Sequence, residues 1–166
     1  SNPSAQGYAI GLTNDLISRG IKSIAAESVN FHGLIHGEHH ERYFIELSEI
    51  SQYLLGFCLC IYCQSAAENA GADAKKLVFE ISAALDKVIK DTDMWLGKEL
   101  SMDNLVSIFG IDIKKWISSQ ERTLTDLNSK LTKLAHSAGA TLRWVGQLPF
   151  IDGLDQGWRI GVSPTE

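Results

Sequence analysis

The feature that most constrains this chain is an apolar run from Tyr53 to Cys63, set within a longer segment that ends in Asn-Ala-Gly at 69–71. Around this run apolar residues recur at alternating steps of four and three, which is the spacing of one helical stripe. The stripe consists of Tyr43, Leu47, Ile50, Leu54, Phe57 and Ile61. Positions off the stripe are apolar within the run too, and a helix that is apolar on every side is covered on every side. The sequence therefore predicts a central buried helix over about 41–70.

Helical spacing recurs in the rest of the chain, whereas residues 1–12 suggest a lead-in or a short edge strand. Further helices are predicted over about 15–29, 74–96, 102–109 and 112–137. Two later segments, 141–145 and 158–162, alternate in polarity and are rich in β-formers, which predicts a β-hairpin over about 140–163. The predicted fold is mainly α. It is a single globular domain, residues 1–166, with four or five helices bundled around the central helix and the hairpin at the C-terminal end.

The cysteines bear on the compartment and on redox chemistry. Cys58, Cys60 and Cys63 all lie inside the apolar run, where neighbours on one helix make poor disulfide partners. A reducing, cytoplasmic location is therefore predicted. Cys60 and Cys63 have C-x-x-C spacing, but free cysteine is among the most buried residue types, so we expect core packing and unreactive thiols rather than a redox or zinc site.

The apolar run is also too short to cross a membrane. It spans eleven residues, against roughly 20 for a transmembrane helix. No basic region precedes an apolar block at the start of the sequence, so no signal peptide is expected. The chain is therefore predicted to have no membrane partner.

Charge is spread unevenly along the chain, whose net charge is −5. Residues 1–97 carry seven basic and twelve acidic side chains, whereas residues 98–138 carry six basic and five acidic ones. The negative balance disfavours a nucleic-acid partner, because phosphates must be neutralised by basic side chains. The most concentrated acidic surface, on and just before the central helix, consists of Glu38, Glu41, Glu46 and Glu49. A basic protein partner is expected to dock there.

Histidines form the candidate metal-binding cluster of the sequence. Four of the five lie within residues 30–40, namely His32, His36, His39 and His40. Imidazoles with neighbouring carboxylates can hold zinc or iron. Their spacing matches no metal motif, however, and Gly33 and Gly37 leave the backbone unconstrained. We therefore predict no bound metal and no cofactor, and keep these four histidines as candidate ligands.

Residues 104–119 are similar to a helix-turn-helix, with Leu105 and Phe109 inside and Gly110 in the turn. Lys114 and Lys115 would then face phosphates. Ile113, however, occupies a place that is usually polar, and the second helix is long. An αα-corner in a helical bundle is the alternative interpretation.

Catalytic motifs are otherwise missing from the sequence, which has no GxSxG, P-loop or GxGxxG. The leading hypothesis is a non-enzymatic interaction protein of the antitoxin or immunity type, which binds a basic protein through its acidic surface. The first alternative is a metal-dependent enzyme that uses the His32–His40 histidines. The second alternative is a helix-turn-helix DNA-binding regulator.

Overall fold

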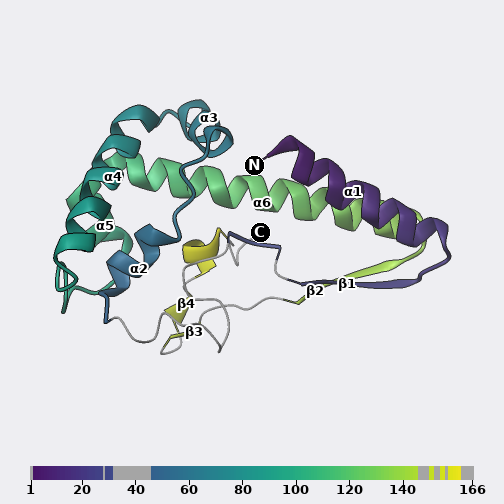
Figure 1. The fold of residues 1–166 in the computed structure, drawn as a ribbon. Helices are drawn as coiled ribbons and strands as arrows, with labels where there is room; N and C mark the ends of the chain where they lie inside the picture. The colour runs from purple at the N-terminus through teal and green to yellow at the C-terminus, as the bar shows by residue number, and fades with distance from the viewer. Residues whose placement is uncertain are drawn as a thin grey trace. The chain divides into compact units, whose positions relative to one another are not determined.

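The computed structural model describes residues 2–27, 29–31, 46–145, 150–151, 154–155 and 157–161 (Figure 1). This part of the chain forms six α-helices, four strands and one 3-10 helix, so the predicted mainly α fold with a strand pair is confirmed. The chain divides into two compact units, one made of Ser1–Asn30 and Gln120–Glu166, the other of Phe31–Ser119. That both units form a single domain stays a prediction. Within the described ranges, no helix is both long and apolar enough to cross a membrane.

The first unit begins with α1, Pro3–Ser18, where the sequence predicts only a lead-in or an edge strand for residues 1–12. Asn2 caps this helix, and its Oδ1 accepts a hydrogen bond from the Ser4 N–H at 2.9 Å. Pro3 at the first helical position adds a second start signal, because the N–H that proline lacks would have no helical partner there. The early start of α1 thus follows from capping chemistry rather than from apolar spacing.

A glycine ends α1. Gly20 has a φ of 83°, and the N–H groups of Gly20 and Ile21 close the last turn onto helix carbonyls at 2.9 and 3.2 Å. Such a left-handed residue is a common helix terminator. The helix predicted over 15–29 is therefore wrong beyond this point, and Ser23–Glu27 form strand β1 instead.

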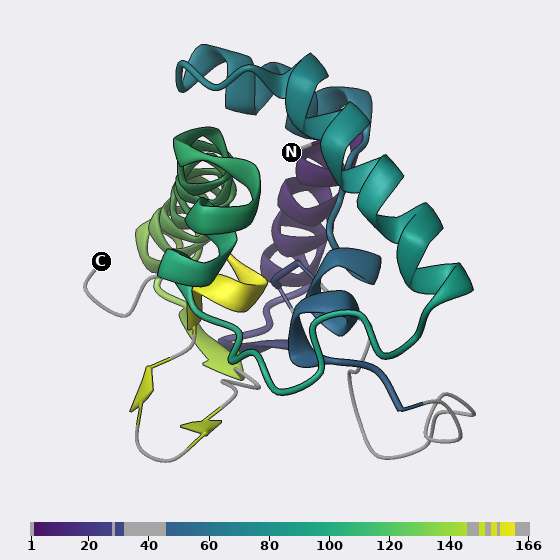
Figure 2. The same cartoon turned by 90° about the vertical axis from the view of Figure 1, so that its left-hand side faces the viewer.

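The strands of the first unit pair in parallel. β1 lies beside β2, Thr141–Val145, in a register that runs from Ser23 opposite Thr141 to Glu27 opposite Val145. The long helix α6, Ile111–Ser137, comes directly before β2 and supplies its last turns to the unit. Figures 1 and 2 show α1 and this part of α6 side by side on one face of the strand pair. The buried residues that join these elements are Ile24, Leu131, Ala135, Ala140 and Leu142.

The predicted hairpin between 141–145 and 158–162 is wrong. β2 pairs with β1, and the described part of the second segment is the 3-10 helix Gly157–Ile160. A short antiparallel pair lies between them, β3 (Phe150–Ile151) with β4 (Leu154–Asp155). Alternating polarity identified β2 as a strand, but alternation does not specify the partner of a strand. A parallel partner also needs a long crossover, and local turn signals do not reveal one.

The second unit is helical. Its elements are α2 (Glu49–Leu55), α3 (Ile61–Asn69), α4 (Ala74–Lys90), α5 (Met102–Phe109) and the first part of α6. Its fully buried side chains come from every one of these helices, and the larger ones are Ile50, Leu54, Cys63, Leu77, Ile81, Val88, Leu105, Ile113, Trp116 and Ile117. Among these helices, α2, α3 and α5 each contact α4.

The central helix predicted over 41–70 is wrong in its described part, because α2 and α3 are separate helices. Gly56 forms the C-cap of α2, and the residues from Phe57 to Leu59 are not helical. The stripe is interrupted there: Leu54 is buried, whereas Ile61 is 68% exposed. A run that is apolar at every position thus reflects two short helices with different inward faces.

Candidate functional site

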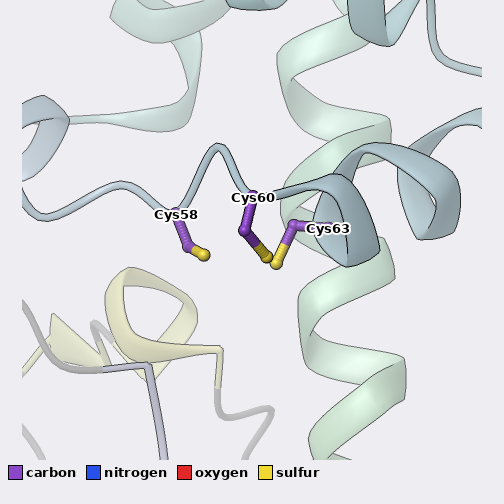
Figure 3. A group of neighbouring side chains, drawn as sticks. All are labelled: Cys58, Cys60 and Cys63. Carbon is purple, nitrogen blue, oxygen red and sulfur yellow. The ribbon is translucent and has the colours of Figure 1, made fainter. Parts of the chain in front are cut away.

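Three thiols converge between α2 and α3. Cys58 lies on the non-helical connection, Cys60 is the N-cap of α3, and Cys63 lies in the first turn of α3. Their sulfur atoms all lie within 4.8 Å of one another. Figure 3 shows the three side chains directed toward a common space. We refer to Cys58, Cys60 and Cys63 as the cysteine cluster.

Two neighbouring residues hold the chain that carries the cluster. Before it, the Phe57 ring lies 5.6 Å from the ring of Trp116, measured between centroids, and Trp116 is fully buried. After it, Gln64 Nε2 donates a hydrogen bond of 2.7 Å to the carbonyl oxygen of Leu59, the residue between the first two cysteines. The Gln64 backbone N–H donates to the Cys60 carbonyl at 3.0 Å. The thiols therefore belong to a fixed turn rather than to a loose loop.

The three cysteines differ in their exposure to solvent. Cys63 is buried, with 2% of its surface exposed, Cys58 is half-buried and Cys60 is exposed. None of the three forms a disulfide. The cluster thus has an inner side at Cys63 and an outer side at Cys60.

The environment moves the pKa values of two of these thiols in opposite directions. Burial by itself would raise the pKa of Cys60, but hydrogen bonding from the Cys63 N–H, the neighbouring thiols and the Tyr62 N–H outweighs it, so this pKa lies below its ordinary 9.0. Thiolates are favoured in this way at helix N-termini. The pKa of Cys63 is raised to about 12, mainly because the thiol is buried. Hydrogen bonding and charge from the other two thiols raise it further. The thiolate form is therefore favoured more at the outer thiol than at the inner one.

A donor set of three sulfurs suits soft metal ions. Zinc–sulfur bonds of about 2.3 Å place tetrahedral sulfur ligands about 3.8 Å apart. The sulfurs of the cluster, all within 4.8 Å of one another, need only small side-chain rotations to reach that spacing. In the part of the chain that the structure describes, no histidine or carboxylate joins this group. A coordinating thiol is deprotonated by the cation itself, so the raised pKa of Cys63 does not prevent binding.

The prediction that all three cysteines lie inside one buried helix is wrong, because Cys60 is exposed and is the N-cap of α3. The overlooked signal was Gly56, which precedes a C-x-C-x-x-C pattern and suits the end of a helix. The expectation for Cys63 alone, a buried side chain, agrees with the structure.

The acidic residues predicted to bind a partner are described only in part. Glu46 is exposed but precedes α2, and Glu49 lies in the first turn of that helix, so the two do not share a helical face. Glu49 Oε2 also accepts a hydrogen bond of 3.3 Å from the Leu100 N–H. Glu38 and Glu41 lie outside the described residues. The acidic surface formed by all four carboxylates therefore stays a prediction.

The histidines proposed as metal ligands also lie outside the described residues. These are His32, His36, His39 and His40. The fifth, His136, is exposed near the end of α6. The metal-dependent enzyme based on these residues stays a hypothesis.

The segment 104–119 forms a tight corner between helices. Gly110, with a φ of 77°, is the one residue between α5 and α6. Of the two lysines expected to face phosphates, Lys114 is exposed, whereas Lys115 Nζ donates to the Gly71 carbonyl and to Asp112, both at 2.8 Å. A turn of one residue is shorter than the three or four typical of a helix-turn-helix. DNA binding stays a hypothesis, and the αα-corner describes the geometry.

Comparisons with protein-family models, with curated proteins and with solved structures find no match to this chain. Among the residues that the structure describes, the cysteine cluster offers the most defined chemistry.

Proposed function

We propose that this protein binds one thiophilic metal ion, such as zinc, through Cys58, Cys60 and Cys63. The observation that carries the proposal is the convergence of three cysteine sulfur atoms within 4.8 Å, none of them in a disulfide. Ligands that already face a common point lose little freedom when they bind, so less of the binding free energy is offset. The soft donor set favours zinc or a similar ion over calcium or magnesium, which prefer oxygen.

The ion would have a structural effect as well. Its ligands lie on both sides of the start of α3, so coordination would tie the non-helical connection to the first turn of that helix. Binding to the folded state alone stabilises a protein by about 2.7 kcal/mol when the free ion is at 100 times its dissociation constant. Removal of the ion is therefore expected to lower the melting temperature.

Metal analysis tests this proposal directly. The chain, purified without a histidine tag and kept reduced, is loaded with zinc, desalted and assayed for metal per protein. We expect one equivalent, and its loss in Cys58→Ser and Cys63→Ser. Ile61→Ser is the matched control, because this residue lies in the same turn and its side chain is exposed. The proposal would be refuted if the wild type held much less than one zinc ion per chain. It would also be refuted if both cysteine variants kept one zinc ion per chain.

The same assay separates the histidine hypothesis from this one. If the cysteine variants retain one equivalent of zinc and His36→Ala/His40→Ala loses it, the metal-dependent enzyme becomes the better hypothesis. If the cysteine variants alone lose it, the histidine hypothesis fails.

A second proposal concerns a basic protein partner, bound in the manner of an antitoxin or immunity protein through Glu38, Glu41, Glu46 and Glu49. It is supported by the net charge of −5 and by the exposure of Glu46 and Glu49. Exposed charges at the edge of an interface mainly tune the association rate. Both proposals suit a reducing, cytoplasmic compartment, where thiols persist.

Charge reversal tests the acidic surface. Once a partner has been captured from a lysate, Glu46→Lys should slow association and flatten its salt dependence. Glu68→Lys, an exposed acidic residue of α3, is the control for a general change of net charge. Equal association rates for Glu46→Lys and the wild type at low and high salt would exclude this surface.

A further inference from the structure

We infer that an ion held by the cysteine cluster keeps one coordination position open on the Cys60 side, and that this position takes the thiolate of a small organic thiol. The inference rests on the proposed metal binding and adds the class of ligand that the site exchanges.

The number of ligands provides the first support. Structural zinc sites are closed by four protein ligands, whereas sites that exchange ligands have three and leave the fourth position to a small molecule. Among the described residues the group of possible ligands has three members, all of them cysteines. An ion bound by these three alone has one coordination position left to fill.

The exposure of the cluster shows where that position faces. Cys63 closes the inner side, being buried, and Cys58 is half-buried. Cys60 is exposed, and the two residues that follow it, Ile61 and Tyr62, expose 68% and 42% of their surfaces. A fourth ligand therefore enters from the solvent side, at the exposed start of α3 to which Ile61 and Tyr62 belong.

These exposed apolar side chains favour an organic ligand over water or hydroxide. The side chains of Ile61 and Tyr62 are exposed to solvent, although both are large hydrophobic residues. A small thiol brings a soft sulfur for the ion and carbon atoms that can cover part of this surface. Bound water offers neither.

The exchange step is a ligand substitution without redox change. The sulfur of the thiol forms a bond to the ion, its proton passes to solvent, and the water that occupied the position leaves. A cation deprotonates a coordinating thiol outright, so the step proceeds at neutral pH. The added negative charge lies at the N-terminus of α3, where the partial positive charge of the helix favours anions.

Sulfur counting by X-ray absorption on the zinc-loaded full chain tests the inference. Without small thiols we expect three sulfur neighbours and one oxygen or nitrogen. With 2-mercaptoethanol we expect four sulfurs, whereas ethylene glycol, its oxygen analogue, should leave the count at three. In the cobalt form, sulfur-to-metal charge-transfer absorption should rise by about one third as a fourth thiolate joins three.

The outcomes separate this inference from the proposed function. Three sulfurs that stay three in 2-mercaptoethanol would overturn the inference alone. An ion without sulfur neighbours would overturn both. Four sulfurs before any thiol is added, together with a zinc-dependent dimer in sedimentation, would show that a second copy supplies the ligand and would overturn the small-thiol assignment.

A paired variant checks the role of the apolar rim. Ile61→Ser/Tyr62→Ser should retain one equivalent of zinc with three sulfurs but take up 2-mercaptoethanol several-fold more weakly. Phe79→Ser, an exposed apolar residue of α4, should leave uptake unchanged. Equal uptake by the rim variant and the wild type would overturn the claim that these side chains favour an organic ligand.

Discussion

Cys60 and Cys63 lie on the same turn and have opposite electrostatic surroundings. Hydrogen bonding at the start of α3 holds the pKa of Cys60 below 9.0, whereas burial raises that of Cys63 to about 12. Because the thiolate is the reactive form, these directions predict an order of reactivity.

In metal-free protein, Cys60 should be alkylated first and Cys63 last. The rate at Cys60 should rise with pH and level off with a midpoint below 9.0, since more thiolate forms as its proton is lost. Cys63 should stay unmodified at neutral pH. Iodoacetamide pulses at a series of pH values, read by peptide mass spectrometry, provide the measurement. Equal rates at the two cysteines would contradict the described geometry.

Burial also separates two residues that the apolar stripe treats as equivalent. Leu54 is 1% exposed and Ile61 is 68% exposed. Leu54→Ala should therefore cost about 2–5 kcal/mol of unfolding free energy, as in other packed cores. Ile61→Ala should change it by no more than about 0.5 kcal/mol. Denaturant melts of both variants test this contrast. Equal losses of unfolding free energy would instead favour a continuous buried helix through both residues.

At the level of elements, a recurring hydrogen bond fixes how helices begin. Gln52 Nε2 donates to the Leu47 carbonyl at the start of α2, and Gln64 Nε2 donates to the Leu59 carbonyl at the start of α3, at 2.9 and 2.7 Å. Both bonds reach five residues back along the chain. Only the second holds the segment that carries the cysteine cluster.

Gln64→Ala should therefore weaken zinc binding, with Gln52→Ala as its matched control. Loss of a group that orients metal ligands typically costs 10–100-fold in affinity, roughly the effect expected for Gln64→Ala. Gln52→Ala removes the same kind of bond elsewhere and should leave zinc affinity unchanged. Competition with a chromophoric chelator gives both affinities. A similar loss in both variants would point to general destabilisation.

Helix bounds can be predicted best from the sequence where a cap marks the ends of the helix. Ser101 and Gly110 bound α5 over the predicted residues 102–109, and Asp73 opens α4 as expected. The break after Gly56 was missed because the count of apolar residues outweighed one glycine. The cysteine cluster was missed with it, since its geometry depends on that break. Strand β1 was missed because its apolar spacing also fits a helix.

At the scale of the whole molecule, β1 and β2 join distant parts of the sequence. Local patterns identified β2, but its partner depends on the crossover through α6, which no short window of sequence contains. Ile24 lies opposite Leu142 in this pair, and both are buried. This register makes a specific prediction about coupled stability.

A double-mutant cycle on Ile24→Ala and Leu142→Ala should give a coupling energy of about 0.5–3 kcal/mol, because residues in contact are not additive. Ile24→Ala combined with Ile81→Ala, from the core of the other unit, is the control and should be additive within about 0.5 kcal/mol. Chemical denaturation of the single and double variants provides the values. If the losses of unfolding free energy in Ile24→Ala and Leu142→Ala simply add up in the double variant, the result would contradict the parallel pairing.

The parallel pairing of β1 with β2 also sets a waiting time during synthesis. Ser23 leaves the ribosome long before Thr141, its partner, has been made. At usual rates of translation the interval is on the order of ten seconds. Throughout it, the backbone groups of β1 have no β2 to bond, while the helices of the second unit can already form from local contacts. The nascent chain is therefore expected to acquire the helices of its second unit before its earliest strand is paired.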